Sequence, residues 1–124
     1  MRKAHLDQAA EAGFTADGVN QLAAFVKAGG DVLFGTDVGY MAEYDPTEEY
    51  ALMARAGMSP TQILTALTVA PAMRFREQGK RGRIEPGMRA DLVILDGDPA
   101  SDVRNFARVR YTIRMGRVIY PLVP

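Results

Sequence analysis

The pattern of the sequence changes near residue 79, and this change limits the possible folds more than any other feature. Before it, apolar residues recur at helical spacing in Thr15–Ala28 and in two further segments that begin at Pro46 and Pro60. After it, glycines at positions 79, 82, 87 and 97 separate short β-rich runs, and helical periodicity is lost. The sequence therefore predicts an α/β portion, residues 1–78, followed by a β-rich portion, residues 79–124.

One short β-rich run lies among the predicted helices of the first portion. The amphipathic segment Thr15–Ala28 is expected to end as a helix at the glycine pair Gly29-Gly30. Asp31–Phe34 then has the composition of a strand buried in a parallel sheet, and Asp37 follows near its C-terminal end. The first portion is thus predicted to begin with a helix that leads into a strand.

The next helix starts are predicted by two dipeptides in which proline follows a capping residue, namely Asp45-Pro46 and Ser59-Pro60. The first of these helices is expected to run to about Ala56, where Gly57 stops it, and the second to run through Val69. Pro71 is expected to begin a third, shorter turn or helix that ends near Gln78.

The β-rich portion contains three runs with strand composition. Ala90–Leu95 is apolar throughout apart from Asp91. Two further runs form a predicted hairpin around Met115-Gly116, namely Val109–Arg114 and Arg117–Tyr120. A buried carboxylate needs hydrogen-bond partners, so we expect Asp91 to accept bonds from backbone or turn donors rather than to take part in catalysis.

The composition excludes several classes of function. Among 124 residues, 15 Lys and Arg balance 15 Asp and Glu without a concentration of one sign, which argues against nucleic acid or a membrane as a partner. Cysteine is absent, which excludes disulfides, thiolate metal sites and cysteine nucleophiles. No apolar run approaches the roughly 20 residues that span a bilayer, and Met1–Gln8 is too polar for a secretory signal. We therefore expect a soluble, cytoplasmic protein.

Four motifs follow one another in an order and spacing that resemble the amidohydrolase superfamily. They are FGTDVG at residues 34–39, VAPA at 69–72, GRIEPGMRADLVILD at 82–96 and IRMGRVI at 113–119. Each motif alone is a weak signal, whereas the ordered set is specific. The resemblance is closest to the branch that contains imidazolonepropionases and prolidase-like dipeptidases, and it covers residues 30–120, while residues 1–29 match only loosely.

The resemblance implies the C-terminal portion of a (β/α)8 metal-dependent hydrolase barrel, followed by part of a small β-sandwich domain. Val32–Phe34 would be the last barrel strand, and residues 79–124 would supply the C-terminal share of the sandwich. A complete barrel of this kind needs about 250 residues. Most of the barrel would therefore have to come from another segment of polypeptide.

The resemblance also assigns a role to Asp37. The matching aspartate of the family ligates a divalent metal, for which we expect zinc, and carries a proton from the metal-bound water to the leaving group. The local sequence leaves open that an aspartate after Gly-Thr caps a turn. The segment after Asp37 faces the substrate in the family, so candidates for a substrate pocket are Val38, Tyr40, Met41 and Tyr44. The two tyrosines and the methionine could equally well cover the end of the barrel.

The metal-binding histidines of the family are missing from this sequence. His5 is the single histidine, and its position about thirty residues before Asp37 does not match the family's ligands. The carboxylates Asp45, Glu48 and Glu49 could hold a hard cation, but an Asp-Pro pair followed by two glutamates is typical of a helix start. We therefore expect the isolated chain to bind no metal tightly and not to hydrolyse amides.

These observations lead to two main hypotheses of function. The first is the C-terminal portion of a metal-dependent amidohydrolase that acts on a C–N bond of a small molecule, either a cyclic amide or a dipeptide-like substrate. The second is a non-catalytic truncated relative that acts as an oligomerisation or assembly module. In both, unpaired strand edges predict association with a missing N-terminal barrel segment or with a second copy. A third, an α+β binding protein with accidental similarity, has the least support.

Overall fold

The computed structural model describes residues 2–37 and 44–121, with side chains from residue 13 onward. The helical elements are α1 (Arg2–Lys27), α2 (Thr47–Arg55), α3 (Pro60–Leu67), α4 (Val69–Arg74) and the 3-10 helix η1 (Val103–Ala107). The strands β1 (Leu92–Leu95), β2 (Val109–Arg114) and β3 (Arg117–Tyr120) form one antiparallel sheet in the order β1-β2-β3.

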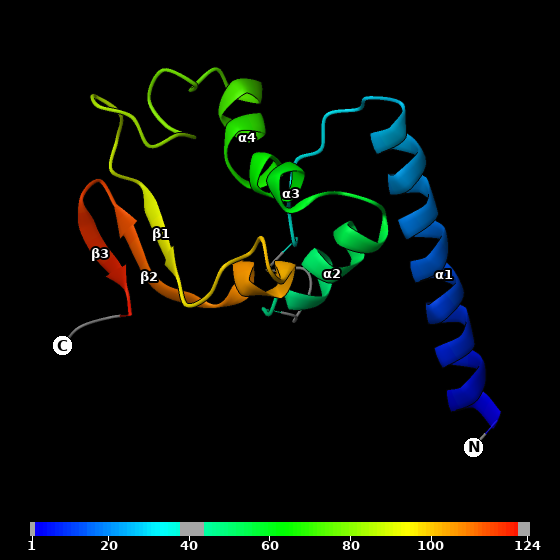
Figure 1. Cartoon of the computed structure of the whole chain (residues 1–124). Helices are drawn as coiled ribbons and strands as arrows, with labels where there is room; N and C mark the ends of the chain where they lie inside the picture. Colours follow the sequence, from blue (N-terminus) through cyan, green and yellow to red (C-terminus); the bar gives the residue numbers. More distant parts are fainter. Residues whose placement is uncertain (1, 38–43, 122–124) are drawn as a thin grey trace.

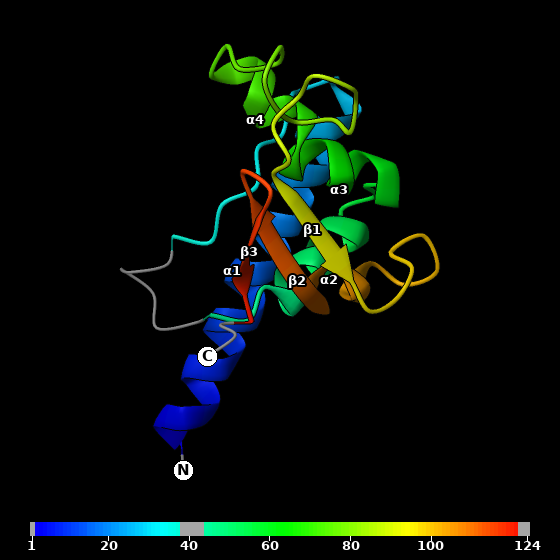
Figure 2. The ribbon, with the colours of Figure 1, turned by 90° about the vertical axis from the view of Figure 1, so that its left-hand side faces the viewer.

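The elements are arranged around a centre formed by α2, α3 and η1. The sheet lies on one side of this centre and α1 on the other, and the first turns of α1 extend away from the remaining elements (Figures 1 and 2). Within the described residues, no helix is long and apolar enough to cross a membrane.

The predicted helices are confirmed, with corrections to their ends. The helix predicted for Thr15–Ala28 begins already at Arg2 and ends at Lys27. The helix predicted to run through Val69 ends at Leu67, and the next begins at Val69 rather than at Pro71. Proline is tolerated in the first turn of a helix because the N–H groups there have no intrahelical partner. A helix can therefore begin before Pro71.

The start of α3 shows why the Ser-Pro signal was reliable. The Ser59 hydroxyl accepts a hydrogen bond from the Gln62 N–H at 3.2 Å, and the Gln62 side-chain oxygen accepts one from the Ser59 N–H at 2.8 Å. This is a complete capping box, with Pro60 at the first helical position. All of its members lie within four consecutive residues, so the sequence alone could predict it.

The strand predicted at Asp31–Phe34 is not a strand in this structure. Residues 31–37 carry no strand assignment, although Val32 and Phe34 pack against the core while Leu33 between them is exposed. A strand needs a neighbour with which it exchanges backbone hydrogen bonds. The described part of the chain places no strand beside this segment, which explains the wrong prediction.

The sheet confirms the predicted hairpin. β2 and β3 have the predicted bounds, and β1 begins at Leu92 rather than at Ala90. The turn residues Met115 and Gly116 have φ angles of 49° and 78°. Two consecutive positive φ angles fit a type I′ turn, whose twist matches that of paired strands.

Asp91 fastens this turn to the start of β1. Its Oδ1 atom accepts a hydrogen bond from the Met115 N–H at 2.8 Å, while the Gly116 N–H donates to the Ala90 carbonyl at 3.0 Å. Arg81 stands on the other side of the carboxylate, with Nη1 3.9 Å from Oδ2. The prediction that Asp91 satisfies turn donors is confirmed.

The buried core joins the helices to η1. Its buried members are Tyr50, Met53, Met58, Ile63, Ala66 and Phe106. The sheet, in contrast, keeps apolar side chains exposed on β1 and β3, namely Val93, Ile94, Val118, Ile119 and Tyr120. Since neighbouring residues of a strand point to opposite faces, Val93 and Ile94 expose both faces of β1. The core thus lies between α2, α3 and η1 rather than on the sheet.

The role of Asp91 can be measured by substitution. We expect Asp91→Ala to lower the free energy of unfolding by about 1–2 kcal/mol, because the turn N–H loses a charged acceptor. Urea denaturation followed by circular dichroism measures the change. Asp96→Ala is the matched control, since Asp96 also borders β1 but forms only an exposed ion pair of 3.8 Å with Arg110. Equal effects of the two substitutions would contradict the role.

Burial of Tyr50 predicts a dependence of stability on alkaline pH. Burial raises the pKa of the Tyr50 hydroxyl above its ordinary value of 10.0. The folded state favours the neutral phenol over the phenolate. The resulting contribution to the free energy of unfolding is complete below pH 10.0 and is lost as the pH rises through the raised pKa. We therefore expect the Tm of Tyr50→Phe to fall less steeply with pH above 10.0 than the Tm of the unsubstituted chain. Tyr120→Phe, which changes an exposed ring, should leave the slope unchanged.

Candidate active site

Asp37 lies at the end of an extended segment that begins at Asp31. Its side chain is exposed, and its backbone φ of 53° lies in the left-handed region. This conformation costs a non-glycine residue about 1–3 kcal/mol, and aspartate is among the few residues that tolerate it. Such backbone geometry is often found at functional sites. The left-handed backbone of Asp37 fits this pattern, and its proton-carrying role stays a prediction.

The segment is held to the helices at Phe34, three positions before Asp37. The Phe34 N–H donates to the Ala66 carbonyl of α3 at 3.2 Å. The Phe34 ring stacks on the ring of Tyr50 in α2, with centroids 5.1 Å apart and planes inclined by 25°. Aromatic pairs of this geometry contribute about 0.5–1.5 kcal/mol beyond their burial. The backbone three residues before Asp37 is thus held by one hydrogen bond and one ring contact.

The four predicted substrate-pocket residues are only partly described. Val38, Tyr40 and Met41 lie outside the described residues. Tyr44 is described, and its side chain is 76% exposed. An exposed ring is available to a ligand. The assignment of these four residues remains a prediction.

The carboxylates that follow have the arrangement expected of a helix start. Asp45 Oδ1 accepts hydrogen bonds from both the N–H, at 2.9 Å, and the hydroxyl of Thr47. The hydroxyl bond, followed by the backbone bond, holds the pKa of Asp45 below its ordinary value. Glu48 and Glu49 lie in the first turn of α2, near the positive end of the helix dipole. These contacts favour a structural role over cation binding.

The described residues do not assemble a metal site by themselves. Within residues 13–37 and 44–121, no three His, Asp or Glu side chains lie close enough together to hold a metal ion. Asp37 is therefore a single candidate ligand. His5 belongs to α1, but its side chain lies outside the described part. A family metal centre would need further ligands beyond those in the described part of the chain.

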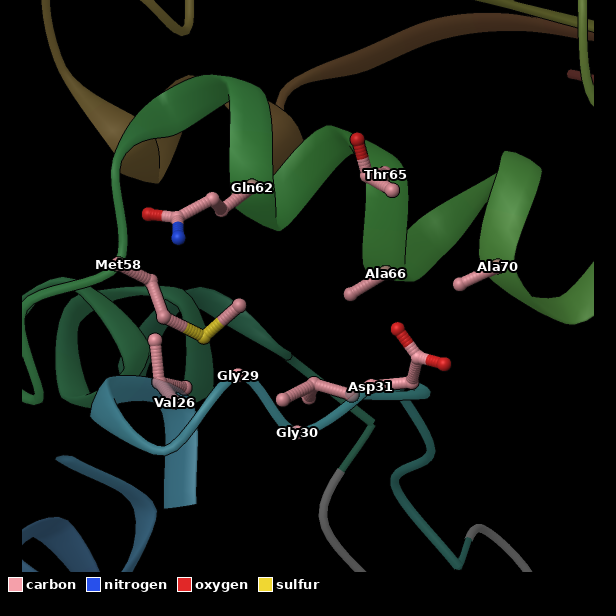
Figure 3. A pocket seen from close by; sticks show the side chains of 10 residues that line it. Val26, Gly29, Gly30, Asp31, Met58, Gln62, Thr65, Ala66 and Ala70 are labelled. Atoms are coloured by element: carbon pink, nitrogen blue, oxygen red, sulfur yellow. The ribbon is translucent and has the colours of Figure 1, made fainter. Parts of the chain in front are cut away.

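A hollow of about 240 Å³ lies between the end of α1 and the helices α3 and α4 (Figure 3). Its lining is mostly small or apolar and consists of Val26, Gly29, Gly30, Asp31, Val32, Met58, Gln62, Thr65, Ala66 and Ala70. No sequence motif predicted this hollow. The one local signal was the pair Gly29-Gly30, which presents no side chains opposite Ala66 and Ala70. Because the hollow lies at the Asp31 end of the extended segment, it does not include Asp37.

The chain is similar to a known family and to several solved structures. The sequence profile of the amidohydrolase family matches residues 4–120. The chain is 35% identical over 63 residues to an adenine deaminase of Rubrobacter xylanophilus. It is similar to a solved Xaa-Pro dipeptidase with methionine bound in the active site, with 27% identity and a TM-score of 0.75. A prolidase solved with N-methylphosphonate-L-proline is 30% identical, with a TM-score of 0.72.

The matches cover much of this chain but little of its relatives. The aligned segment is 51% of this chain and 10% of the adenine deaminase. The dipeptidase match covers 81% of this chain and 25% of that protein, and the prolidase match covers 82% and 26%. The chain therefore spans about a quarter of the length of these solved relatives. Since the family profile extends over residues 4–120, this protein belongs to the amidohydrolase family.

Proposed function

We propose that the chain is the C-terminal portion of a metal-dependent amidohydrolase and that Asp37 is its catalytic residue. The observation that carries the proposal is the position of Asp37, exposed and left-handed, at the end of a segment held to α2 and α3. Residues 1–78 would form the last part of the hydrolase barrel. Residues 79–124 would belong to a β-sandwich beside it.

The chemistry of C–N bond hydrolysis explains why a carboxylate is needed there. Water must lose a proton before it attacks the carbonyl carbon, and the departing nitrogen must gain one. A carboxylate within reach of both groups can carry that proton. Asp37 has the residue type and the exposure for this task.

Metal dependence is general in the amidohydrolase family, and in the proposed enzyme a bound divalent ion, for which we propose zinc, would activate the water. The described residues supply one candidate ligand, Asp37. One protein ligand is too few for a complete metal site. We therefore assign this chain the proton-carrying carboxylate alone. The remaining ligands would come from other polypeptide.

Unpaired backbone and exposed apolar surface support association with that polypeptide. Residues 31–37 are without strand partners among the described residues, and Leu33 in this segment is 42% exposed. Exposed strand edges and apolar patches favour pairing with another chain. We propose that a preceding barrel segment pairs here. A second copy of the chain is the alternative occupant.

The substrate class is proposed from the relatives together with the residues after Asp37. Two matched proteins are a Xaa-Pro dipeptidase and a prolidase, and a third is an adenine deaminase. We propose a small molecule with a C–N bond, either dipeptide-like or a cyclic amide. Its contacts would come from Val38, Tyr40, Met41 and Tyr44.

A non-catalytic assembly module is the second candidate function. The observation that favours it is that no group of three metal-binding side chains comes together in the described part of the chain. In that case the exposed sheet residues and the segment 31–37 would serve association without turnover. The two candidates differ in whether Asp37 matters once the barrel is complete.

A hybrid protein separates the two candidates. We would join the chain to the part of the Xaa-Pro dipeptidase that precedes the matched region and measure hydrolysis of a Xaa-Pro dipeptide with added zinc. We expect turnover, and we expect Asp37→Asn to lower kcat/KM by roughly 10²- to 10⁴-fold because the proton carrier is lost. Asp31→Asn, at the other end of the same segment, is the control and should retain activity. Turnover that survives Asp37→Asn would refute the catalytic assignment.

The isolated chain gives a second test. We expect zinc added to the purified chain to be removed by dialysis, because one carboxylate with water is a weak site. Elemental analysis by mass spectrometry should then find far less than one zinc per chain. One zinc per chain after dialysis would show that the chain supplies more ligands than Asp37.

A further inference from the structure

Three aromatic rings contact one another in a row, one pair stacked and the other tilted. Phe34 stacks on Tyr50 with centroids 5.1 Å apart, and Tyr50 contacts Phe106 at 5.5 Å with planes inclined by 55°. Tyr50 is 6% and Phe106 is 8% exposed, so the stack is shielded from water beyond its first ring. We call these three side chains the aromatic stack.

The aromatic stack connects parts of the molecule that are distant in sequence. Phe34 belongs to the extended segment, Tyr50 to α2 and Phe106 to η1, which precedes β2. One end of the stack therefore lies three residues from Asp37, and the other lies in the β-rich portion. A displacement of η1 would reach the extended segment through the Tyr50 ring, since packed interiors transmit strain.

The side chain of Asp37 is exposed, so buried packing of that side chain does not fix its position. Between Phe34 and Asp37 lie only Gly35 and Thr36, and glycine has little conformational preference. A fixed point three residues before Asp37 therefore limits the positions that its left-handed backbone can take. The described contacts at Phe34, its ring on Tyr50 and its N–H on the Ala66 carbonyl, supply that point.

We infer that Tyr50 and Phe106 are positioning residues for Asp37. They hold the Phe34 ring in place. In this way they fix the position and direction of the backbone that runs from Phe34 to the catalytic carboxylate of Asp37. The catalytic consequence rests on the proposed function, whereas the effect on the backbone of Asp37 does not. The β-rich portion thereby contributes to the active site without contacting the substrate.

The backbone effect can be measured on the chain alone by nuclear magnetic resonance. We expect Tyr50→Leu to shift the amide and Cα signals of Thr36 and Asp37, with loss of the couplings that report a positive φ. Tyr50→Phe retains the ring and should leave these signals in place. Phe106→Leu, at the far end of the stack, should shift them in the same direction and serves as the second variant if Tyr50→Leu does not fold.

Met53→Ala is the matched control for general loss of packing. Met53 lies in the same helix as Tyr50 and is 5% exposed, but it is not part of the aromatic stack. We expect this variant to be destabilised while the Asp37 signals stay in place. Asp37 signals that are unchanged in Tyr50→Leu, or shifted as far in Met53→Ala, would overturn the inference.

The catalytic consequence is tested in the dipeptidase hybrid. A displacement of about 1 Å in a catalytic group can cost about 10²-fold in rate, so we expect Tyr50→Leu and Phe106→Leu to lower kcat by roughly 10- to 100-fold. KM should change little, since substrate contacts are not removed, and Tyr50→Phe should restore kcat. Unchanged kcat in both leucine variants would refute the catalytic consequence. An inactive unsubstituted hybrid would count against the proposed function instead, while the resonance signals still decide the positioning.

Discussion

Burial of the Tyr50 ring between Phe34 and Phe106 is the interaction on which the rest of this structure depends. It brings together the extended segment, α2 and η1, which are separated along the chain. The core around it is small, and the sheet adds no buried layer of its own. Local structure alone cannot compensate for its loss, because short isolated helices are marginal in water. The order of the Asp37 region follows from this contact.

Local signals explain which elements could be predicted from the sequence. The start of α3 depends on Ser59 and Gln62, and the hairpin turn depends on Met115-Gly116, so each is determined within a few residues. The acceptor role of Asp91 toward turn donors was also predicted, since a carboxylate within an apolar run needs hydrogen-bond partners. In contrast, Asp31–Phe34 was wrongly predicted as a strand, because strand formation requires a neighbour that no local pattern reveals.

Less of the candidate site than of the helices and the hairpin could be predicted from the sequence. The Gly-Thr-Asp motif identified Asp37, but neither its left-handed backbone nor the support at Phe34 follows from the motif. Contacts such as Tyr50 with Phe106 join residues far apart in the chain, and a single sequence carries no record of such pairs. The hollow beside Gly29 and Gly30 was missed for the same reason, since its opposite wall belongs to α3 and α4.

The place of Phe106 in the core has a consequence for synthesis on the ribosome. α1 to α4 emerge first, and their helices can form as they appear, yet the Tyr50 ring has its second aromatic neighbour only after η1 has been made. Until then the side of the Tyr50 ring that contacts Phe106 lacks its partner, and exposed apolar surface of this kind favours aggregation in incompletely folded chains. The second portion of the chain therefore completes a core whose other buried members all belong to the first portion.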